Sequence, residues 1–228
     1  AVPLGELYSQ DAWRSIPQVN IRFKTPVTRI EFDGGRVGAV YSGEERFTAD
    51  FYVSALPFER LALLATPLGI DFSPFEHSPI TGIHLWFDRP VMDLPHATLL
   101  DRTLQWVFNK QDGRYLQLVV SASRSLTEMP RGEVIEMALR ELREFFPAAG
   151  EAQLVKAHVV KEVRATFSAK PGLEECRPEA KTNVENLVLA GDWTRSGWPA
   201  TMEGAVRSGY RAADVIHPAG RALLPDIA

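Results

Sequence analysis

The chain has 228 residues, of which 45% are hydrophobic and 24% charged, and its formal net charge is −4 at pH 7. These proportions are ordinary for a soluble globular protein with enough chain for one good core or two small ones. A slightly acidic chain gives no electrostatic basis for binding nucleic acid or an anionic membrane surface.

Cys176 is the only cysteine, which excludes an intrachain disulfide framework and fits a reducing compartment. No apolar run approaches the roughly 18–20 residues that span a bilayer. Residues 1–13 lack the basic start and long apolar core of a signal peptide. We therefore expect a cytoplasmic protein, with peripheral membrane association as an alternative. The five histidines show no metal-ligand spacing, so we expect no metal site.

The first third of the chain predicts a short helix or irregular segment over residues 2–15, followed by strands. Alternating apolar and polar residues, separated by glycine turns, predict strands at 19–23, 27–32, 36–41 and 46–54. The pattern is typical of a β-meander that ends in ADFYVSALP. Pro57 then begins a helix that runs through Leu64, since the first helical turn has no N–H partner to lose.

The middle of the chain predicts a second sheet and a covering helix. Residues 67–79 are rich in proline and turn residues and mark a crossing between subdomains. Short β-branched or aromatic runs predict antiparallel strands at 80–87, 105–109 and 115–121. The apolar face of 133–146 predicts a helix, and 153–163 alternates as a further strand. Residues 165–186 form a long connection that we expect to be functional or mobile.

The C-terminal part predicts a buried strand at 187–190, a Gly191-Asp192 turn, a loop and a helix that ends near residue 216. Asp192 follows the carboxyl end of the strand, where open α/β sheets bind ligands. Thr201 is the expected N-cap. Since a helix N-terminus carries unpaired N–H groups and a partial positive charge, it suits an anion or a polarised carbonyl oxygen. Small residues at 204, 208 and 212 predict unusually close packing of this helix.

The stretch 186–216 resembles the C-terminal flavin-binding signature of the amine oxidase and phytoene desaturase superfamily of FAD enzymes. Within it, GDWTRSGWPATMEGAVRSG is most similar to the squalene-associated FAD-dependent desaturases, the hydroxysqualene dehydroxylases. TPVTRIEFDGGRV paired with ADFYVSALP is also similar to that family. Taken alone, the second resemblance has a simpler interpretation as a plain three-stranded meander.

The resemblance implies FAD as the cofactor and names residues for it. Val27 would meet the adenine through its main chain, and Asp192 would bind the ribityl or pyrophosphate region. The amides of Thr201 to Glu203 would point at the pyrimidine edge of the isoalloxazine ring. The predicted cofactor-contacting set is Val27, Gly191, Asp192, Trp198, Pro199, Ala200, Thr201, Met202, Glu203 and Ala205.

Three of these assignments have structural alternatives. Asp192 could be a turn residue, and Glu203 could serve only the helix dipole. Lys161 is the one catalytic candidate, because a lysine from this region of amine oxidases holds a water near flavin N5. A lysine on an alternating strand is otherwise a solvated side chain.

The predicted fold class is α+β. Residues 16–66 and 151–217 would form a partial FAD-binding domain, and 67–150 a substrate domain with an antiparallel or mixed sheet and a covering helix. Nothing in the chain supplies the N-terminal GxGxxG βαβ unit of the family. We therefore expect a truncated or split polypeptide whose partner is the missing half or a separate chain. Self-association of the exposed surface is an alternative.

The expected function is that of an FAD-dependent oxidoreductase acting on a long isoprenoid of the hydroxysqualene, squalene or phytoene type. The reaction would be hydride transfer via flavin in hopanoid or carotenoid-type biosynthesis. Two alternatives stay open: another flavin amine oxidase-like oxidoreductase, and a catalytically inactive half that needs a separate FAD-binding chain. Whether NADPH reduces the flavin is also open.

Overall fold

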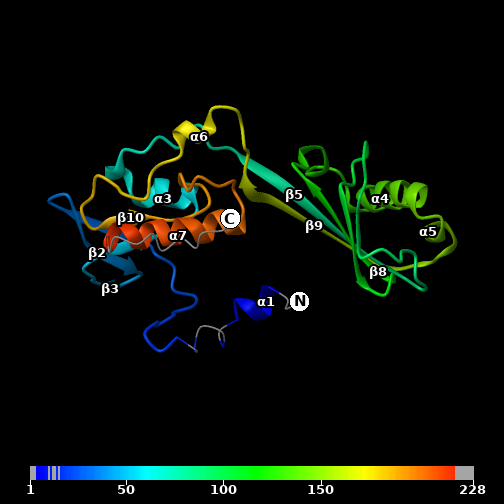
Figure 1. Ribbon diagram of the computed structural model, residues 1–228, viewed down its shortest axis with the longest axis horizontal. Helices are drawn as coiled ribbons and strands as arrows, with labels where there is room; N and C mark the ends of the chain where they lie inside the picture. The colour runs from blue at the N-terminus through cyan, green and yellow to red at the C-terminus, as the bar shows by residue number, and fades with distance from the viewer. Residues whose placement is uncertain (1–3, 10, 12–13, 15, 219–228) are drawn as a thin grey trace.

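The computed structural model describes residues 4–9, 11, 14 and 16–218, and arranges them in two lobes (Figure 1). Two long antiparallel strands, β5 and β9, run from one lobe into the other. In the N-terminal segment α1 (Leu4–Leu7) is a short helix; Trp13, part of the expected helical pattern, lies outside the described residues.

A three-stranded antiparallel sheet opens the first lobe, with order β1-β2-β3 (Arg29–Asp33, Arg36–Ser42, Glu45–Phe47). Gly34 and Gly35 make its first turn with φ of 54° and 85°, values that glycine adopts without steric cost. The strand predicted at 19–23 is wrong, since these residues lie in turns and irregular chain. Val19 and Phe23 are 45% and 54% exposed, so their alternation has no sheet face to bury.

The run predicted as one strand at 46–54 is two strands in different sheets. β3 ends at Phe47, and β4 (Tyr52–Ser54) pairs in parallel with β10 (Leu187–Leu189). The three-stranded meander therefore ends at Phe47, before the segment ADFYVSALP with which it was predicted to end. The physical reason is a long-range pairing that local alternation cannot signal, because residues 135 positions away supply the partner (Leu187↔Tyr52).

Helices pack around this parallel pair. α3 (Phe58–Leu64) begins after Pro57 as predicted, with the proline at the N-cap, and a 3₁₀ turn follows at Thr66–Leu68. α7 (Met202–Ile216) buries Gly204, Ser208 and Ala212 and packs against β10, which confirms the close packing expected of its small residues. The core of this lobe is rich in aromatic rings: Phe58, Phe75, Phe167 and Trp193.

The second lobe is built on a five-stranded antiparallel sheet with order β6-β7-β8-β5-β9. Its strands are β5 (His77–Phe87), β6 (His96–Thr98), β7 (Trp106–Gln111), β8 (Tyr115–Ser121) and β9 (Leu154–Phe167). The helices are a 3₁₀ turn (Arg124–Leu126), α4 (Arg131–Phe145) and α5 (Ala148–Glu151). The strands and the helix predicted for this region are confirmed. The sequence did not predict β6, because three residues are too few to show an alternating pattern.

The two faces of this sheet differ in chemistry. The face toward α4 buries aliphatic side chains, among them Ile83, Leu85 and Leu118. On the opposite face aromatic and histidine rings lie partly exposed. The rings of Trp86 and Tyr115 stack at 4.5 Å, and Tyr115 Oη lies 2.8 Å from His84 Nδ1. We call this the aromatic face, made of His84, Trp86, Trp106, Phe108 and Tyr115.

The pairing of β9 with β5 bears on the predicted two-part division. Residues 154–167 pair with β5 along nearly its whole length, although the sequence division groups them with the FAD-side part, 151–217. The division into two parts itself stays a prediction. Near its end β9 carries a bulge: from Ser78 to Ile80 the register advances two residues on β5, while it advances four on β9, from Thr166 to Glu162.

The connection predicted over 165–186 is anchored in the core rather than loose. It contains the end of β9 and α6 (Leu173–Cys176), and it buries Phe167, Leu173, Arg177 and Asn186. The amide of Asn186 exchanges two hydrogen bonds with the main chain of Val37, of 2.7 and 3.0 Å. Among the described residues, none of the helices has both the length and the apolar character needed to cross a bilayer.

Candidate cofactor site

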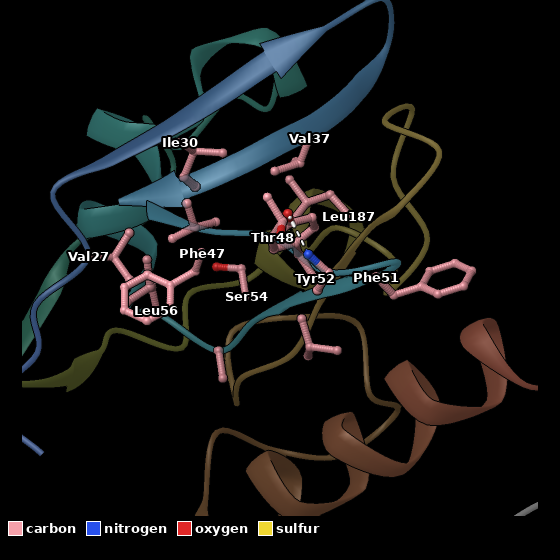
Figure 2. Close-up of a pocket in the computed structure, with 14 residues that line it drawn as sticks. Val27, Ile30, Val37, Phe47, Thr48, Phe51, Tyr52, Ser54, Leu56 and Leu187 are labelled. Atoms are coloured by element: carbon pink, nitrogen blue, oxygen red, sulfur yellow. Dashed lines mark hydrogen bonds between the residues drawn. The ribbon is translucent and has the colours of Figure 1, made fainter. Parts of the chain in front are cut away.

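Two adjoining cavities lie where β4 and β10 end. The first has a volume of about 540 Å³ and lies between β4 and the three-stranded sheet (Figure 2). The second, of about 410 Å³, lies between α3, the end of β9 and α7. Ala55 and Leu56 line both cavities, so the two adjoin at these residues, and together we call them the trough.

The first cavity is largely apolar, and three of its lining residues carry a hydroxyl group: Thr48, Tyr52 and Ser54. Val27, Phe47, Tyr52 and Leu187 are among the side chains that surround it, as Figure 2 shows. Ser54 is 8% exposed, and its Oγ has no hydrogen-bond partner among the described residues. The cavity therefore suits a flat apolar group that carries at least one polar atom.

The second cavity has charged and polar walls. Glu59, His77, Arg164 and Asp192 line it. Two further buried oxygens there, Glu59 Oε2 and Thr166 Oγ1, have no partner among the described residues. A buried polar atom without a partner costs about 1–3 kcal/mol, so both oxygens call for a bound polar group or water.

These atoms provide the fit test for a cofactor. Of the five buried side-chain atoms without a partner in the described chain, three line the trough: those of Ser54, Glu59 and Thr166. Such atoms are rare in folded proteins and call for an explanation each. Their concentration in the trough fits an extended ligand with polar groups at several points along its length.

The Gly191-Asp192 turn has the position predicted for it. Gly191 has φ of 130°, and a Cβ there would lie 2.6 Å from Trp193 Nε1, so the backbone requires glycine. Its N–H donates to Ser208 Oγ of α7 at 2.7 Å. Burial raises the pKa of the Asp192 carboxyl above its ordinary value, and the charge of Arg177 works in the opposite direction. Asp192 is therefore a half-buried carboxyl at the cavity wall.

The start of α7 is capped as predicted. Thr201 Oγ1 accepts a hydrogen bond of 3.1 Å from the N–H of Gly204. The N–H of Ala205 donates to the Thr201 carbonyl, which leaves those of Met202 and Glu203 without an intrahelical acceptor. A Cβ on Gly204 would lie 2.4 Å from the Pro199 carbonyl oxygen, so glycine is needed for this close approach.

The structure brings four of the predicted residues to the trough. Val27 lines the first cavity, and Gly191, Asp192 and Ala205 line the second. The other predicted contacts lie outside it, and Trp198 and Met202 are 41% and 52% exposed. The residues that remain predictions without a place in the trough are Trp198, Pro199, Ala200, Thr201, Met202 and Glu203.

Lys161 also lies outside the trough. Its ammonium group donates to the carbonyl of Thr127 at 2.9 Å and to that of Met129, in the turn that leads into α4. The side chain thus ties β9 to the loop before this helix. A catalytic role for Lys161 finds no support in this position.

Sequence reasoning missed one residue that organises the site. Arg177 is 5% exposed and donates to the carbonyls of Asp192 (2.8 Å), Thr194 (2.5 Å) and Trp198 (3.0 Å). It stands in the connection 165–186, which shows no periodicity. No local pattern could have marked it, because its partners lie 15 to 21 residues further along the chain.

Comparison with protein families defines the class. Residues 6–217 match the family described as flavin containing amine oxidoreductase, and the chain belongs to that family. Membership implies a flavin cofactor, which agrees with the extended polar and apolar trough.

Two curated relatives narrow the comparison. Over 166 residues the chain is 37% identical to a hydroxysqualene dehydroxylase of Sinorhizobium fredii, covering 73% of this chain and 38% of that protein. Over 202 residues it is 31% identical to a 15-cis-phytoene desaturase of Synechococcus elongatus, covering 79% and 43%. The chain thus spans about two fifths of the length of these relatives.

Solved structures agree on the fold. A cyclohexylamine oxidase from Brevibacterium oxydans superposes with a TM-score of 0.56 at 17% identity, over 87% of this chain and 49% of that one. An oxidoreductase from Methanosarcina mazei gives a TM-score of 0.59 at 17% identity, over 86% and 48%. At such identities the likeness shows the fold alone.

Proposed function

We propose that this chain is the C-terminal portion of an FAD-dependent oxidoreductase that acts on a long isoprenoid of the hydroxysqualene, squalene or phytoene type. The observation that carries the proposal is the trough, with its three unpartnered buried oxygens and with Val27 and Asp192 in its two cavities. FAD, when bound, supplies hydride transfer.

The apolar first cavity would take the adenine end, with the main chain of Val27 in contact. The second cavity would take the ribityl and pyrophosphate region, where Asp192 can accept hydrogen bonds from hydroxyl groups. Ser54, Glu59 and Thr166 would gain the partners that their oxygens lack. The free amides of Met202 and Glu203 would serve the pyrimidine edge, where a helix N-terminus stabilises negative charge.

The aromatic face supports an isoprenoid substrate. It spans β5, β7 and β8, and the first residue of β5, His77, lines the second cavity. From His77 to Trp86 the strand extends roughly 30 Å at about 3.3 Å per residue, a length suited to an extended hydrocarbon. Stacked rings such as Trp86 and Tyr115 offer apolar faces to it. This chain need not supply a dedicated acid or base, since the flavin carries the redox step.

A further FAD-binding unit is part of the proposal, either in the same polypeptide or in a separate chain. β4 and β10 form a sheet of only two strands among the described residues, and parallel sheets of that size are rarely stable alone. Val53 on β4 is 50% exposed, and Phe51, which precedes this strand, is 45% exposed. A strand that adds to β4 would cover them. A second copy of this chain is the alternative occupant.

For such a substrate we propose a cytoplasmic location with peripheral contact to a membrane, because a long hydrocarbon partitions into lipid. A hopanoid or carotenoid-type biosynthetic role follows from the same substrate class. Reduction of the flavin by NADPH is left open.

A second candidate is another oxidoreductase of the same fold that acts on an amine. The family description, flavin containing amine oxidoreductase, favours it. The aromatic face discriminates between the two, since a small amine would not use rings that extend far from the cavity. An inactive half that depends on a separate chain is the third candidate.

The test is direct. The purified chain, alone and co-expressed with an FAD-binding unit from a relative, is titrated with FAD and followed by flavin absorbance. Bound flavin supports the proposal, and turnover of hydroxysqualene or phytoene rather than cyclohexylamine selects the isoprenoid class. Failure to bind flavin in both forms contradicts it, and flavin binding with turnover of the amine alone selects the second candidate.

A further inference from the structure

Arg177 stands at the centre of a set of contacts to one loop. It belongs to the connection 165–186, and its side chain, which is 4% exposed, reaches the loop 192–198. Three carbonyl oxygens of that loop, from Asp192, Thr194 and Trp198, accept its N–H groups. The hydroxyl of Ser196 lies within 3.3 Å of the same guanidinium.

The contacted loop joins the two ends of the proposed cofactor site. It begins at Asp192 in the second cavity and leads to Thr201, the N-cap of α7. Its own backbone hydrogen bonds involve the amides of only three residues, Thr194, Arg195 and Ser196. The Thr194 carbonyl also accepts from the N–H of Ser196, and the Trp198 carbonyl from the hydroxyl of Ser196, both within the loop. Arg177 adds one buried group that joins three carbonyls spaced along the loop, and so helps to fix the path between the carboxyl and the helix.

An arginine is suited to this task where a lysine is not. Nη1 reaches the carbonyl of Trp198, and Nη2 reaches those of Asp192 and Thr194. The planar guanidinium presents both nitrogens in a fixed fork, whereas an ammonium is a single point with three donors. Glu174, which is 56% exposed, balances the buried charge at 2.5 Å.

We propose that Arg177 is the positioning residue of the cofactor site, which holds the Asp192 carboxylate and the first turn of α7 in the geometry that flavin binding requires. This inference rests on the proposed function for its cofactor. The same cation also opposes protonation of Asp192, whose pKa burial raises.

The test compares Arg177→Lys with Arg195→Lys. Arg195 belongs to the same loop and also donates to a backbone carbonyl, that of Glu175 at 2.7 Å, but its side chain is 41% exposed and directed outward. Two quantities are measured: amide hydrogen exchange of residues 193–201, and the dissociation constant of FAD. Exchange in β7 and β8 reports whether the whole fold is affected.

For Arg177→Lys we expect exchange in 193–201 to rise about tenfold or more and FAD to bind about tenfold more weakly, since hydrogen bonds to a charged group are lost. Exchange in β7 and β8 should not change, and Arg195→Lys should behave as the unaltered chain. Unchanged loop exchange and affinity in Arg177→Lys overturn the inference.

Two further outcomes are decided in advance. If Arg177→Lys does not fold, Arg177→Gln takes its place, because its shorter neutral amide cannot reach all three carbonyls and leaves no charge to bury. Faster loop exchange in that variant supports the inference, and unaltered exchange overturns it. If the unaltered chain binds no flavin, the proposed function fails, while the loop exchange still decides whether Arg177 positions the loop.

Discussion

The indole Nε1 of Trp193 donates a hydrogen bond of 3.0 Å to the carbonyl of Leu56, 137 residues earlier in the chain. Trp193 follows the carboxyl end of β10, and Leu56 follows that of β4. Leu56 also lines both cavities of the trough. This one contact therefore fixes the distance between the two strand ends that frame the proposed cofactor site, and it does so from the core side.

Replacement of Gly191 by alanine should break that arrangement. The new Cβ would meet Trp193 Nε1 at 2.6 Å, and φ at this position is 130°. We expect a loss of about 1–3 kcal/mol in the free energy of unfolding from backbone strain and displaced packing. Urea denaturation measures it. Trp193→Phe removes the hydrogen bond and leaves unfilled space beside a side chain that is 2% exposed, so it should cost about 1–3 kcal/mol. Equal stability of Gly191→Ala and the unaltered chain would show that the turn relaxes freely.

A matched pair of glycines on α7 tests the close packing of its first turn. A Cβ on Gly204 would lie 2.4 Å from the carbonyl oxygen of Pro199, whereas a Cβ on Gly209 would meet nothing within 4 Å. Gly204→Ala should destabilise the protein by about 1–3 kcal/mol, and Gly204→Leu by at least as much. Gly209→Ala should stabilise it by up to about 1 kcal/mol through helix propensity. Thermal unfolding distinguishes them, and a stable Gly204→Leu would place this face in solvent.

Asp192 makes stability depend on pH with a definite sign. Burial raises its pKa in the folded state, so the folded protein holds the proton more tightly than the unfolded chain. The stabilisation is fully present below the ordinary pKa of an aspartate and is lost as pH rises through the raised value. Asp192→Asn should therefore gain stability relative to the unaltered chain at neutral pH, and this gain should shrink on acidification.

Urea unfolding at several pH values checks this dependence, and a FAD titration accompanies it. The same variant should bind FAD more weakly, because it loses one of the two carboxylate oxygens and the negative charge that strengthens hydrogen bonds from cofactor hydroxyls. An asparagine variant that binds FAD as tightly as the unaltered chain removes Asp192 from the proposed site.

Lys161 offers a test of the position found for it. Lys161→Met removes two hydrogen bonds to the carbonyls before α4, which should cost about 1–3 kcal/mol of stability. We expect the rate of flavin reduction per bound flavin to be unaffected, because the side chain lies outside the trough. Stopped-flow reduction of the assembled enzyme measures that rate. A large fall in the rate with unaltered stability would restore the catalytic role that the sequence suggested.

The aromatic face predicts a specific kinetic signature. Trp86→Leu removes one ring of the stacked pair with Tyr115. In the assembled enzyme we expect KM for the isoprenoid to rise several-fold with kcat nearly constant, since uniform binding energy is lost. Leu100→Ser, at a position 72% exposed, is the control. A change in kcat without a change in KM would contradict the assignment of this face to the substrate.

Local periodicity was sufficient for much of the fold. Alternation predicted β8 at its observed bounds, and the apolar face of α4 predicted that helix within two residues at its start. The N-cap at Thr201 followed from the residue type alone. Each of these elements carries its pattern within a short window of its own sequence, even though β8 pairs with the distant strand β5.

Other features depend on partners far along the chain, and no window contains them. β4 forms a separate strand because β10 pairs with it. The role of Arg177 depends on its hydrogen bonds to backbone carbonyls of another segment. The trough could not be predicted from the sequence, because nothing in the sequence shows that oxygens of Ser54, Glu59 and Thr166 are buried without a partner among the described residues. Of the residues that line it, the sequence had named Val27, Gly191, Asp192 and Ala205.

The bulge near the end of β9 has a consequence for variation of the site. Between Thr166 and Glu162 the strand holds two residues more than β5 requires, and Arg164 and Ala165, which line the second cavity, belong to that surplus. A shortening of the chain by two residues at this point would restore even pairing and withdraw the arginine, while every core contact of the sheet persisted. Chain length at one bend can thus alter the electrostatic character of the cavity independently of the residues that hold the fold.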